Sequence, residues 1–171
     1  KLFKKIKDKP NENPPTSTGI LGDWYCNTLI IQRQHNILCV SEKTLLPILL
    51  PAKDMARFPI RLQGAVADTL KEIGVSDLQI EKEILEMGTW TFSKTASRQI
   101  LGSMNDFAHI LFVTMERGFS LEDHAEFLRD IPCSPIGMNS PFRATIESFS
   151  EKENETMLQS RPILRLVKPM K

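Results

Sequence analysis

Residues 23–40 read DWYCNTLIIQRQHNILCV, two apolar runs on either side of a polar cluster. The first run is rich in β-branched and aromatic side chains, the cluster at 33–36 interrupts it, and residues 37–40 resume it. This pattern predicts a β-hairpin, because β-branched and aromatic residues favour strands and a polar cluster favours the turn between them. We therefore expect two neighbouring strands over residues 23–32 and 37–40.

Two more short strands are expected, at 45–50 and at 88–93. Pro47 in the first of them cannot donate a hydrogen bond to a neighbouring strand, so we expect that strand at a sheet edge or at a bulge. Residues 89–92 alternate threonine with aromatic side chains, which is the period of a half-buried strand.

The same alternation applies to the first strand of the hairpin. It places Asp23, Tyr25 and Asn27 on one face of the strand. Trp24 and Cys26 fall on the other face. We expect Trp24 to pack in the core, with a partner surface as the alternative, because its large apolar area is usually buried.

Helices are predicted in the remainder of the chain. Residues 57–73 repeat apolar side chains at helical spacing, and Gly74 stands where a C-terminal glycine cap belongs. Ser76 is expected to cap a second helix to Leu85, and Ser120 with Asp123 predicts a later one to Leu128. The longest helix is expected near 96–117, capped by Thr95 or Ser97. Its predicted apolar face consists of Ile100, Met104, Phe107, Ala108, Leu111, Phe112 and Met115.

These elements predict an α+β fold. We expect an antiparallel sheet of three to five short strands packed against two or three helices, with the long helix near 96–117 in the centre. At 171 residues, the chain fits one globular domain over 1–149. Residues 150–171 are polar and poor in core side chains, so we expect a flexible tail there, with a short final strand near 163–167 as an option.

Composition and charge exclude several classes of protein. Hydrophobic residues make up 41% and charged residues 25% of the chain, which is ordinary for a soluble globular protein. No apolar run approaches the roughly 20 residues that span a bilayer, so we expect no membrane partner. The three cysteines include no CxxC pair, and an odd count fits a reducing cytoplasm better than a disulfide framework.

Polar residues that could form a site gather around the start of the long helix. Lys94 and Thr95 would reach its N-terminal end, where unpaired backbone N–H groups and the helix dipole favour an anion. Arg98, Gly102, Asn105 and His109 fall on one face of the helix, opposite the apolar stripe. The candidates for binding a ligand or partner are Asp23, Asn27, Glu42, Lys43, Lys94, Thr95, Arg98, Ser103, Asn105 and Asp106. The histidines and cysteines lack metal-ligand spacing and no nucleotide-binding glycine motif occurs, so we expect no metal and no cofactor.

Three functions compete for these candidates. The first is a non-enzymatic interaction module whose polar face binds a protein or a nucleic acid. The second is a hydrolase or phosphoryl-transfer enzyme, in which Lys94 and Arg98 hold an anion and Glu42 or Asp106 acts as a base. The third is a structural polar network that ties the hairpin to the long helix. Because no pattern of nucleophile and base is present, the first is favoured; the sequence assigns neither a catalytic residue nor an oligomeric state.

Three segments carry a resemblance to a known family. They are GDWYCN at 22–27, EKTL at 42–45 and KTASRQILGSMND at 94–106. In this order the chain resembles a family of small uncharacterised bacterial proteins in which GDWYxN, EKTL and KTxxRxxLGSMND segments recur, followed by a Pro-rich stretch like that at 132–135. The resemblance covers residues 2–149 and implies a bacterial, cytoplasmic protein, with some relatives encoded near plasmid or mobile-element genes. It implies no activity and no catalytic residue.

Overall fold

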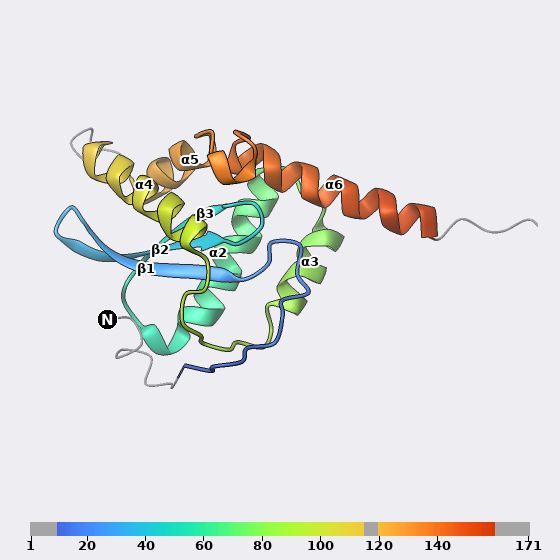
Figure 1. Cartoon of the computed structure of the whole chain (residues 1–171), viewed down its shortest axis with the longest axis horizontal. Helices are drawn as coiled ribbons and strands as arrows, with labels where there is room; N and C mark the ends of the chain where they lie inside the picture. The colour runs from blue at the N-terminus through green and yellow to red at the C-terminus, as the bar shows by residue number, and fades with distance from the viewer. Residues whose placement is uncertain (1–9, 115–119, 160–171) are drawn as a thin grey trace, which may run out of the picture.

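The computed structural model describes residues 10–114 and 120–159. Figure 1 shows a three-stranded antiparallel sheet in the order β1 (Trp24–Ile31), β2 (Gln34–Ser41), β3 (Pro47–Pro51). The helical elements are η1 (Met55–Arg57), α2 (Phe58–Glu72), α3 (Asp77–Glu86), α4 (Arg98–Thr114), α5 (Leu121–Arg129), η3 (Ser134–Ile136) and α6 (Pro141–Gln159). The predicted α+β fold is confirmed, with α4 where the long helix was expected.

The predicted hairpin is confirmed, but its turn lies earlier than expected. The turn consists of Gln32 and Arg33, which both have positive φ, 49° and 62°. Two positive φ values are typical of a type I′ turn, whose twist matches that of the flanking strands. The polar residues that follow belong to β2, so the prediction of a break over 33–36 is wrong for 34–36. Type I′ turns usually carry Asn and Gly, and this one has neither, so the polar cluster placed the turn at Arg33 and missed Gln32.

β3 lies at a sheet edge, which confirms the expectation for Pro47. The strand begins at Pro47, two residues later than predicted. Beyond its other end, Ala52 N–H donates to His35 O at 2.8 Å. Hydrogen-bonded and non-hydrogen-bonded pairs alternate in an antiparallel ladder, so Pro51 and Pro47 both stand at non-hydrogen-bonded positions. The edge strand therefore loses no ladder bond to its prolines.

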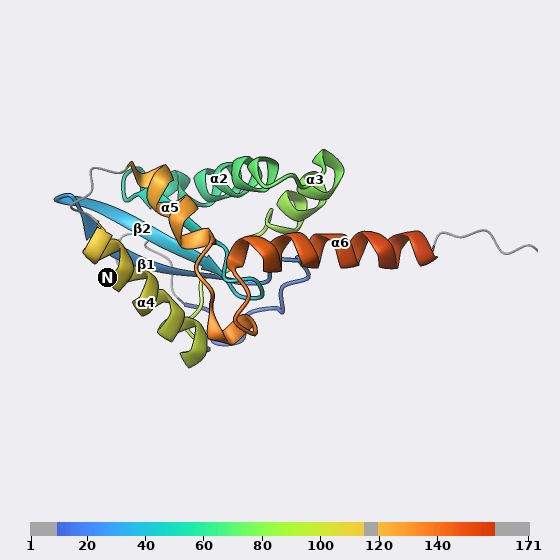
Figure 2. The same ribbon diagram turned by 90° about the horizontal axis from the view of Figure 1, so that it is seen from above.

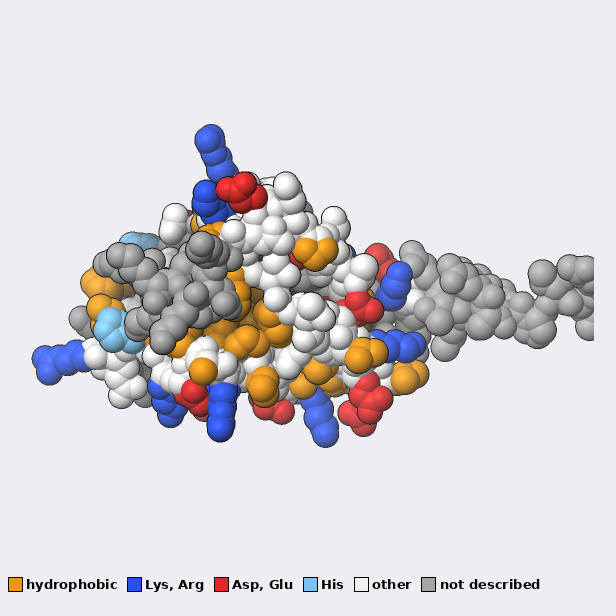
Figure 3. All heavy atoms as spheres, turned by 90° about the horizontal axis from the view of Figure 1, so that it is seen from below, with side chains coloured by type: hydrophobic (Ala, Val, Ile, Leu, Met, Phe, Trp, Pro, Cys, Tyr) orange, Lys and Arg blue, Asp and Glu red, His pale blue; other side chains and the backbone are white. Residues whose placement is uncertain are grey.

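The sheet lies between two helical layers, with α2 on one face and α4 on the other (Figure 2). The core on the α2 side includes Ile37, Cys39, Ile48, Leu62 and Val66. The core on the α4 side includes Tyr25, Leu38, Val40, Met104 and Phe107. Trp24 and Cys26 pack against the α2-side core, so the predicted alternation of β1 and the core position of Trp24 are confirmed. Figure 3 shows one face of the molecule, where hydrophobic side chains gather in the middle and charged side chains stand at the rim.

The ends of α2, α3 and α5 follow the predicted caps. Gly74, just past α2, has a φ of 87°. At the start of α3, the Ser76 hydroxyl donates to Gln79 Oε1 at 2.7 Å. At the start of α5, Ser120 N–H donates to Asp123 Oδ2 at 2.8 Å and Asp123 N–H donates to Ser120 Oγ at 3.1 Å. The backbone hydrogen bond from Ser120 lowers the pKa of Asp123, as expected for a carboxylate that accepts an N–H at a helix start.

The long helix α4 is confirmed, with one error in its predicted apolar face. Ile100 N–H donates to Ser97 Oγ at 3.3 Å, so Ser97 caps the helix rather than Thr95. Phe112, predicted in the core, is 72% exposed. It follows the buried Leu111 and is therefore turned about 100° away from it around the helix axis. Met115, also predicted on this face, lies outside the described residues.

The predicted strand at 88–93 is wrong. The segment is irregular, and its one pairing is an isolated parallel bridge between Ser93 and Asn11. Trp90 is partly buried against the α2-side core. The threonine–aromatic alternation thus reflects packing of this segment on the core, and among the described residues no strand of the sheet runs beside it.

The segment from residue 150, expected to be a flexible polar tail, begins within a helix, and its flexibility stays a prediction. α6 continues to Gln159. Its first half is anchored by Phe149, which is 2% exposed, and the residues that follow are largely Glu, Lys, Met and Gln, which favour helix. The first half of α6 is therefore packed on the core, and polar residues continue the helix. The optional strand near 163–167 lies outside the described residues, and a domain boundary at 149 remains a proposal.

Candidate functional site

Three of the predicted candidates meet at the corner where β1 begins and β2 ends. Glu42 N–H donates to Asp23 O at 2.8 Å, and Asp23 N–H donates to Glu42 Oε2 at 3.3 Å. Lys43 Nζ donates to Gly19 O at 2.8 Å. Gly22 has a φ of 75°, and a Cβ on it would lie 3.0 Å from Glu42 Oε2 and from Lys43 Cγ. This corner is therefore closely packed around a glycine, with two carboxylates and one ammonium group at its surface.

Tyr25 connects the corner to the start of α4. Burial raises the pKa of the Tyr25 phenol, and the nearby Glu42 carboxylate raises it further. Backbone hydrogen bonds from Ser97 and Ala96 act in the opposite direction. The phenol thus lies between the acidic corner and the residues that lead into α4. The expected proximity of the hairpin to the start of the long helix is a feature of the structure, and Tyr25 mediates it.

We expect Asp23→Asn to stabilise the protein at pH 7. Burial, and then the charge of Glu42, raise the pKa of Asp23, and Lys43 only partly opposes them. A raised carboxyl pKa means that the folded state binds the proton more tightly, so the contribution of Asp23 to stability falls as pH rises from the ordinary Asp value through the raised one. Asparagine carries no charge, so the gain should be present at pH 7 and absent near pH 3, where the wild-type carboxyl is protonated.

The gain from Asp23→Asn should be below about 1 kcal/mol, because water screens this half-exposed group. Thermal unfolding of both proteins at the two pH values measures it. Asp77→Asn is the matched control, since Asp77 lies in the first turn of α3, where a negative charge stabilises the helix, and its removal should lower stability. Equal effects of the two substitutions would contradict the prediction.

A second group of candidates lies along the exposed side of α4. We call this surface the α4 outer face; its residues are Arg98, Leu101, Asn105, His109, Phe112 and Val113, which are all exposed. Phe112 and Val113 are 72% and 60% exposed. The predicted polar line of Arg98, Asn105 and His109 is therefore a surface feature, and apolar side chains flank it. Sequence reasoning missed this mixed character because Phe112 was expected in the core.

The other candidates differ in their surroundings. Lys94 and Thr95 are exposed in the segment before α4, and Asn27 is exposed on β1. Asp106 lies on another side of α4: burial, and then the Asp106 charge, raise the pKa of the Cys133 thiol to about 11. Ser103 is buried and its hydroxyl donates to Gln99 O at 3.4 Å. The ten candidates thus lie in different surroundings, and Ser103 has a structural contact.

A buried hydroxyl network, which the sequence did not suggest, lies between the β2–β3 turn and α6. Thr44, in the β2–β3 turn, has its Oγ1 2.9 Å from Ser41 Oγ and 2.9 Å from Thr145 Oγ1 on α6. Thr145 also donates to Pro141 O at 2.7 Å. The third hypothesis expected a polar network between the hairpin and the long helix. The structure contains a polar network that joins the sheet to α6.

Metal and membrane features can be stated for the described part of the chain. Across residues 10–114 and 120–159, no three His, Cys, Asp or Glu side chains are grouped as metal ligands would be. No helix within those ranges combines the length and the apolar character that crossing a membrane requires.

The fold and the surface define a small α+β protein whose three-stranded sheet is covered by helices on both faces and whose long helix presents a mixed polar and apolar surface. The chain belongs to the family described as Domain of unknown function (DUF6933), which matches residues 1–144. Comparison with curated proteins found no match, and comparison with solved structures found none. The predicted membership of a family of uncharacterised proteins is confirmed, and the match ends within the first turn of α6.

Proposed function

We propose that the protein is a non-enzymatic interaction module that binds a protein partner through the α4 outer face. The observation that carries the proposal is the exposure of Phe112 and Val113 beside Arg98, Asn105 and His109. Exposed aromatic side chains and arginine are enriched where proteins bind one another. The apolar pair would supply buried area in the complex, and the polar line would set its orientation.

A protein partner suits this surface better than a nucleic acid. Arg98 is the cation of the α4 outer face, and the whole chain has a net charge of +1. Binding to a phosphate backbone depends on several Lys or Arg contacts. Lys94 could add one more cationic contact. The other end of the face carries the apolar side chains of Phe112 and Val113, which offer a phosphate no favourable contact.

The enzymatic alternative remains a prediction without a specific observation in its favour. It requires a base close to Lys94 and Arg98. The Glu42 carboxylate raises the pKa of Tyr25, whose phenol lies at the start of α4. Asp106 lies two turns along the helix, where its charge raises the pKa of Cys133. A bacterial and cytoplasmic setting, and an association with mobile genetic elements, are likewise proposals that rest on the resemblance of the motifs.

Site-specific photocrosslinking tests the proposed function. A photoreactive phenylalanine analogue placed at Phe112 or at Asn105 should label one and the same protein in cells of the source organism. The same analogue at Glu81, an exposed position on α3, is the control and should not label it. Labelling that is absent, or equally strong from position 81, would contradict the proposal.

Arg98→Ala supplies the second arm of this test. Because Arg98 is exposed, the substitution should change the free energy of unfolding by less than about 0.5 kcal/mol. It should nevertheless weaken labelling from Phe112. Fluorescence anisotropy with DNA and RNA at low and moderate salt completes the experiment. Binding that weakens steeply as salt rises would assign the face to a nucleic acid instead.

A further inference from the structure

Two of the three cysteines lie directly opposite each other in the hairpin. Cys26 of β1 pairs with Cys39 of β2. The Asp23–Glu42 pair, three positions away, is hydrogen-bonded, since Glu42 N–H donates to Asp23 O at 2.8 Å. Hydrogen-bonded and non-hydrogen-bonded pairs alternate, so the cysteines occupy a non-hydrogen-bonded pair, in which Cα atoms are about 4.5 Å apart. That separation lies within the range of about 4.4 to 6.8 Å that a disulfide spans.

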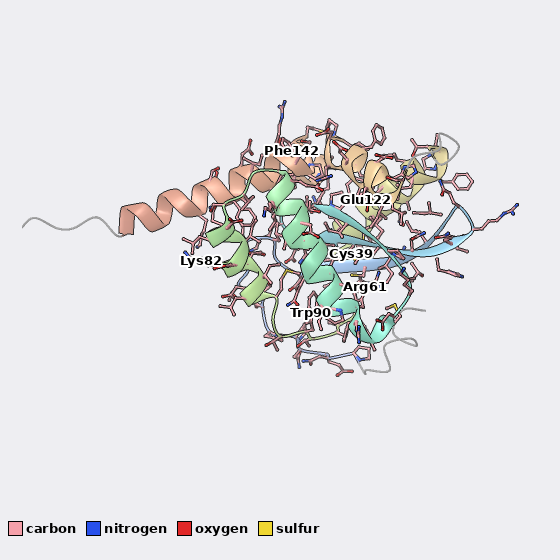
Figure 4. The ribbon with its side chains drawn as sticks, turned by 180° about the vertical axis from the view of Figure 1, so that it is seen from behind. Cys39, Arg61, Lys82, Trp90, Glu122 and Phe142 are labelled. Carbon is pink, nitrogen blue, oxygen red and sulfur yellow. The ribbon has the colours of Figure 1, made fainter. Side chains whose placement is uncertain are left out.

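The two thiols point to the same side of the sheet and differ in access. Both belong to the α2 side, where Cys39 is fully buried and Cys26 is only partly buried. Burial, and then the neighbouring Cys26, raise the pKa of Cys39 well above its ordinary value, and the Arg61 guanidinium opposes this rise. Figure 4 shows Cys39 beneath α2, beside Arg61 of that helix. Cys26 is thus the thiol that a dissolved oxidant meets first.

We propose that Cys26 and Cys39 are a redox modification site that a hydroperoxide converts into a disulfide between β1 and β2. The Cys26 sulfur takes one oxygen atom from the peroxide and becomes a sulfenic acid, and one water is released when hydrogen peroxide is the oxidant. The Cys39 sulfur then attacks the Cys26 sulfur. The S–S bond forms as the S–O bond breaks, and the hydroxyl leaves with the Cys39 proton as a second water. Two thiols are oxidised and one peroxide is reduced.

Cys133 provides an internal control for this chemistry. It belongs to the core on the α4 side of the sheet, the face opposite the cysteine pair. Its thiol donates to Ile131 O at 3.3 Å, and burial raises its pKa to about 11. Cys133 should therefore remain reduced under conditions that oxidise the pair.

Peptide mapping of the peroxide-treated full-length protein tests the proposal. After treatment, free thiols are blocked with N-ethylmaleimide in denaturant, and the protein is digested with trypsin without reduction. Arg33, in the turn between the two cysteines, is a cleavage site, so a disulfide would join the peptide ending at Arg33 to peptide 34–43. The expected result is this joined pair, a mass loss of about 2 Da for the intact protein, and N-ethylmaleimide on Cys133 alone.

Several outcomes would overturn the proposal. They are the recovery of all cysteines as blocked thiols, sulfinic acid on Cys26 without joined peptides, a disulfide that includes Cys133, and a disulfide between two copies of the chain. Cys133→Ser should keep the joined peptides, and Cys39→Ser should abolish them and leave Cys26 oxidised beyond the sulfenic state. If Cys39→Ser does not fold, the map of the wild-type protein still decides between the outcomes.

Discussion

Replacing Glu83 with alanine is expected to lower the free energy of unfolding by about 3 to 5 kcal/mol. Glu83 lies on α3 and is 3% exposed. Its carboxylate accepts hydrogen bonds from Ile20 N–H at 2.7 Å and from Leu21 N–H at 3.0 Å. Removing the carboxylate leaves one buried and one partly buried backbone donor without an acceptor, at about 1 to 3 kcal/mol each, and the rest comes from lost packing.

Thermal unfolding measures the effect of Glu83→Ala, with an expected fall in the midpoint of about 10 °C for a chain of this size. Glu81→Ala is the control, because Glu81 lies on the same helix and is exposed; it should change the midpoint little. Glu83→Gln retains one acceptor oxygen and should fall between the two. A midpoint for Glu83→Ala that equals that of Glu81→Ala would show that the carboxylate does not hold the segment before β1.

A double-mutant cycle with Gly19 makes the same test from the other side. A Cβ on Gly19 would lie 2.8 Å from Glu83 Oε1, closer than such atoms pack, so Gly19→Ala should displace the carboxylate. The two substitutions then remove the same interaction, and their costs should not add. Additive costs would mean that Gly19→Ala destabilises the protein by a route other than the displacement of Glu83.

Phe107→Ala is the second substitution with a large expected effect. Phe107 is 1% exposed in the core between the sheet and α4, and the loss of such a side chain costs about 3 to 5 kcal/mol. Phe112→Ala, on the same helix, removes the same atoms from a side chain that is 72% exposed. Chemical denaturation should show the loss for Phe107→Ala and a change below about 0.5 kcal/mol for Phe112→Ala.

The two phenylalanine substitutions also separate folding from binding. Phe112→Ala should remain folded and lose the partner that the α4 outer face is proposed to bind. If Phe112→Ala were as unstable as Phe107→Ala, the residue would belong to the core after all, and the proposed interaction surface would lose its apolar part.

Local patterns predicted the elements of this fold where the signal is contained in a few neighbouring residues. The apolar spacing of α2, the Ser120–Asp123 pair at the start of α5 and the alternation in β1 are such signals, and all three are confirmed. The strand expected at 88–93 is wrong for a physical reason. Alternation reports that every second side chain is buried, and Trp90 is partly buried without a neighbouring strand in the sheet.

The polar contacts that join the elements could not be predicted in this way. Glu83 and Ile20 are 63 positions apart, and Thr44 and Thr145 are 101 apart. No periodicity within a window of about 18 residues contains such pairs. The corner of Asp23, Glu42 and Lys43 could be predicted from the hairpin alone. The register of the hairpin brings the residue before β1 beside the residue after β2. For Phe112, a helical wheel could have indicated exposure, since it lies outside the buried stripe.

The hydroxyl network at Thr145 attaches α6 to the sheet. Its second turn is bonded to the β2–β3 turn through Thr44, and Gln79 of α3 donates to Phe149 O at 2.9 Å. Two neighbouring elements thus hold the base of the helix, while its far half extends away from the sheet (Figure 1). From Thr145 to Gln159 a helix advances about 21 Å. These two contacts therefore set the direction in which α6 leaves the sheet, and loss of the Thr145 hydroxyl should let that direction vary.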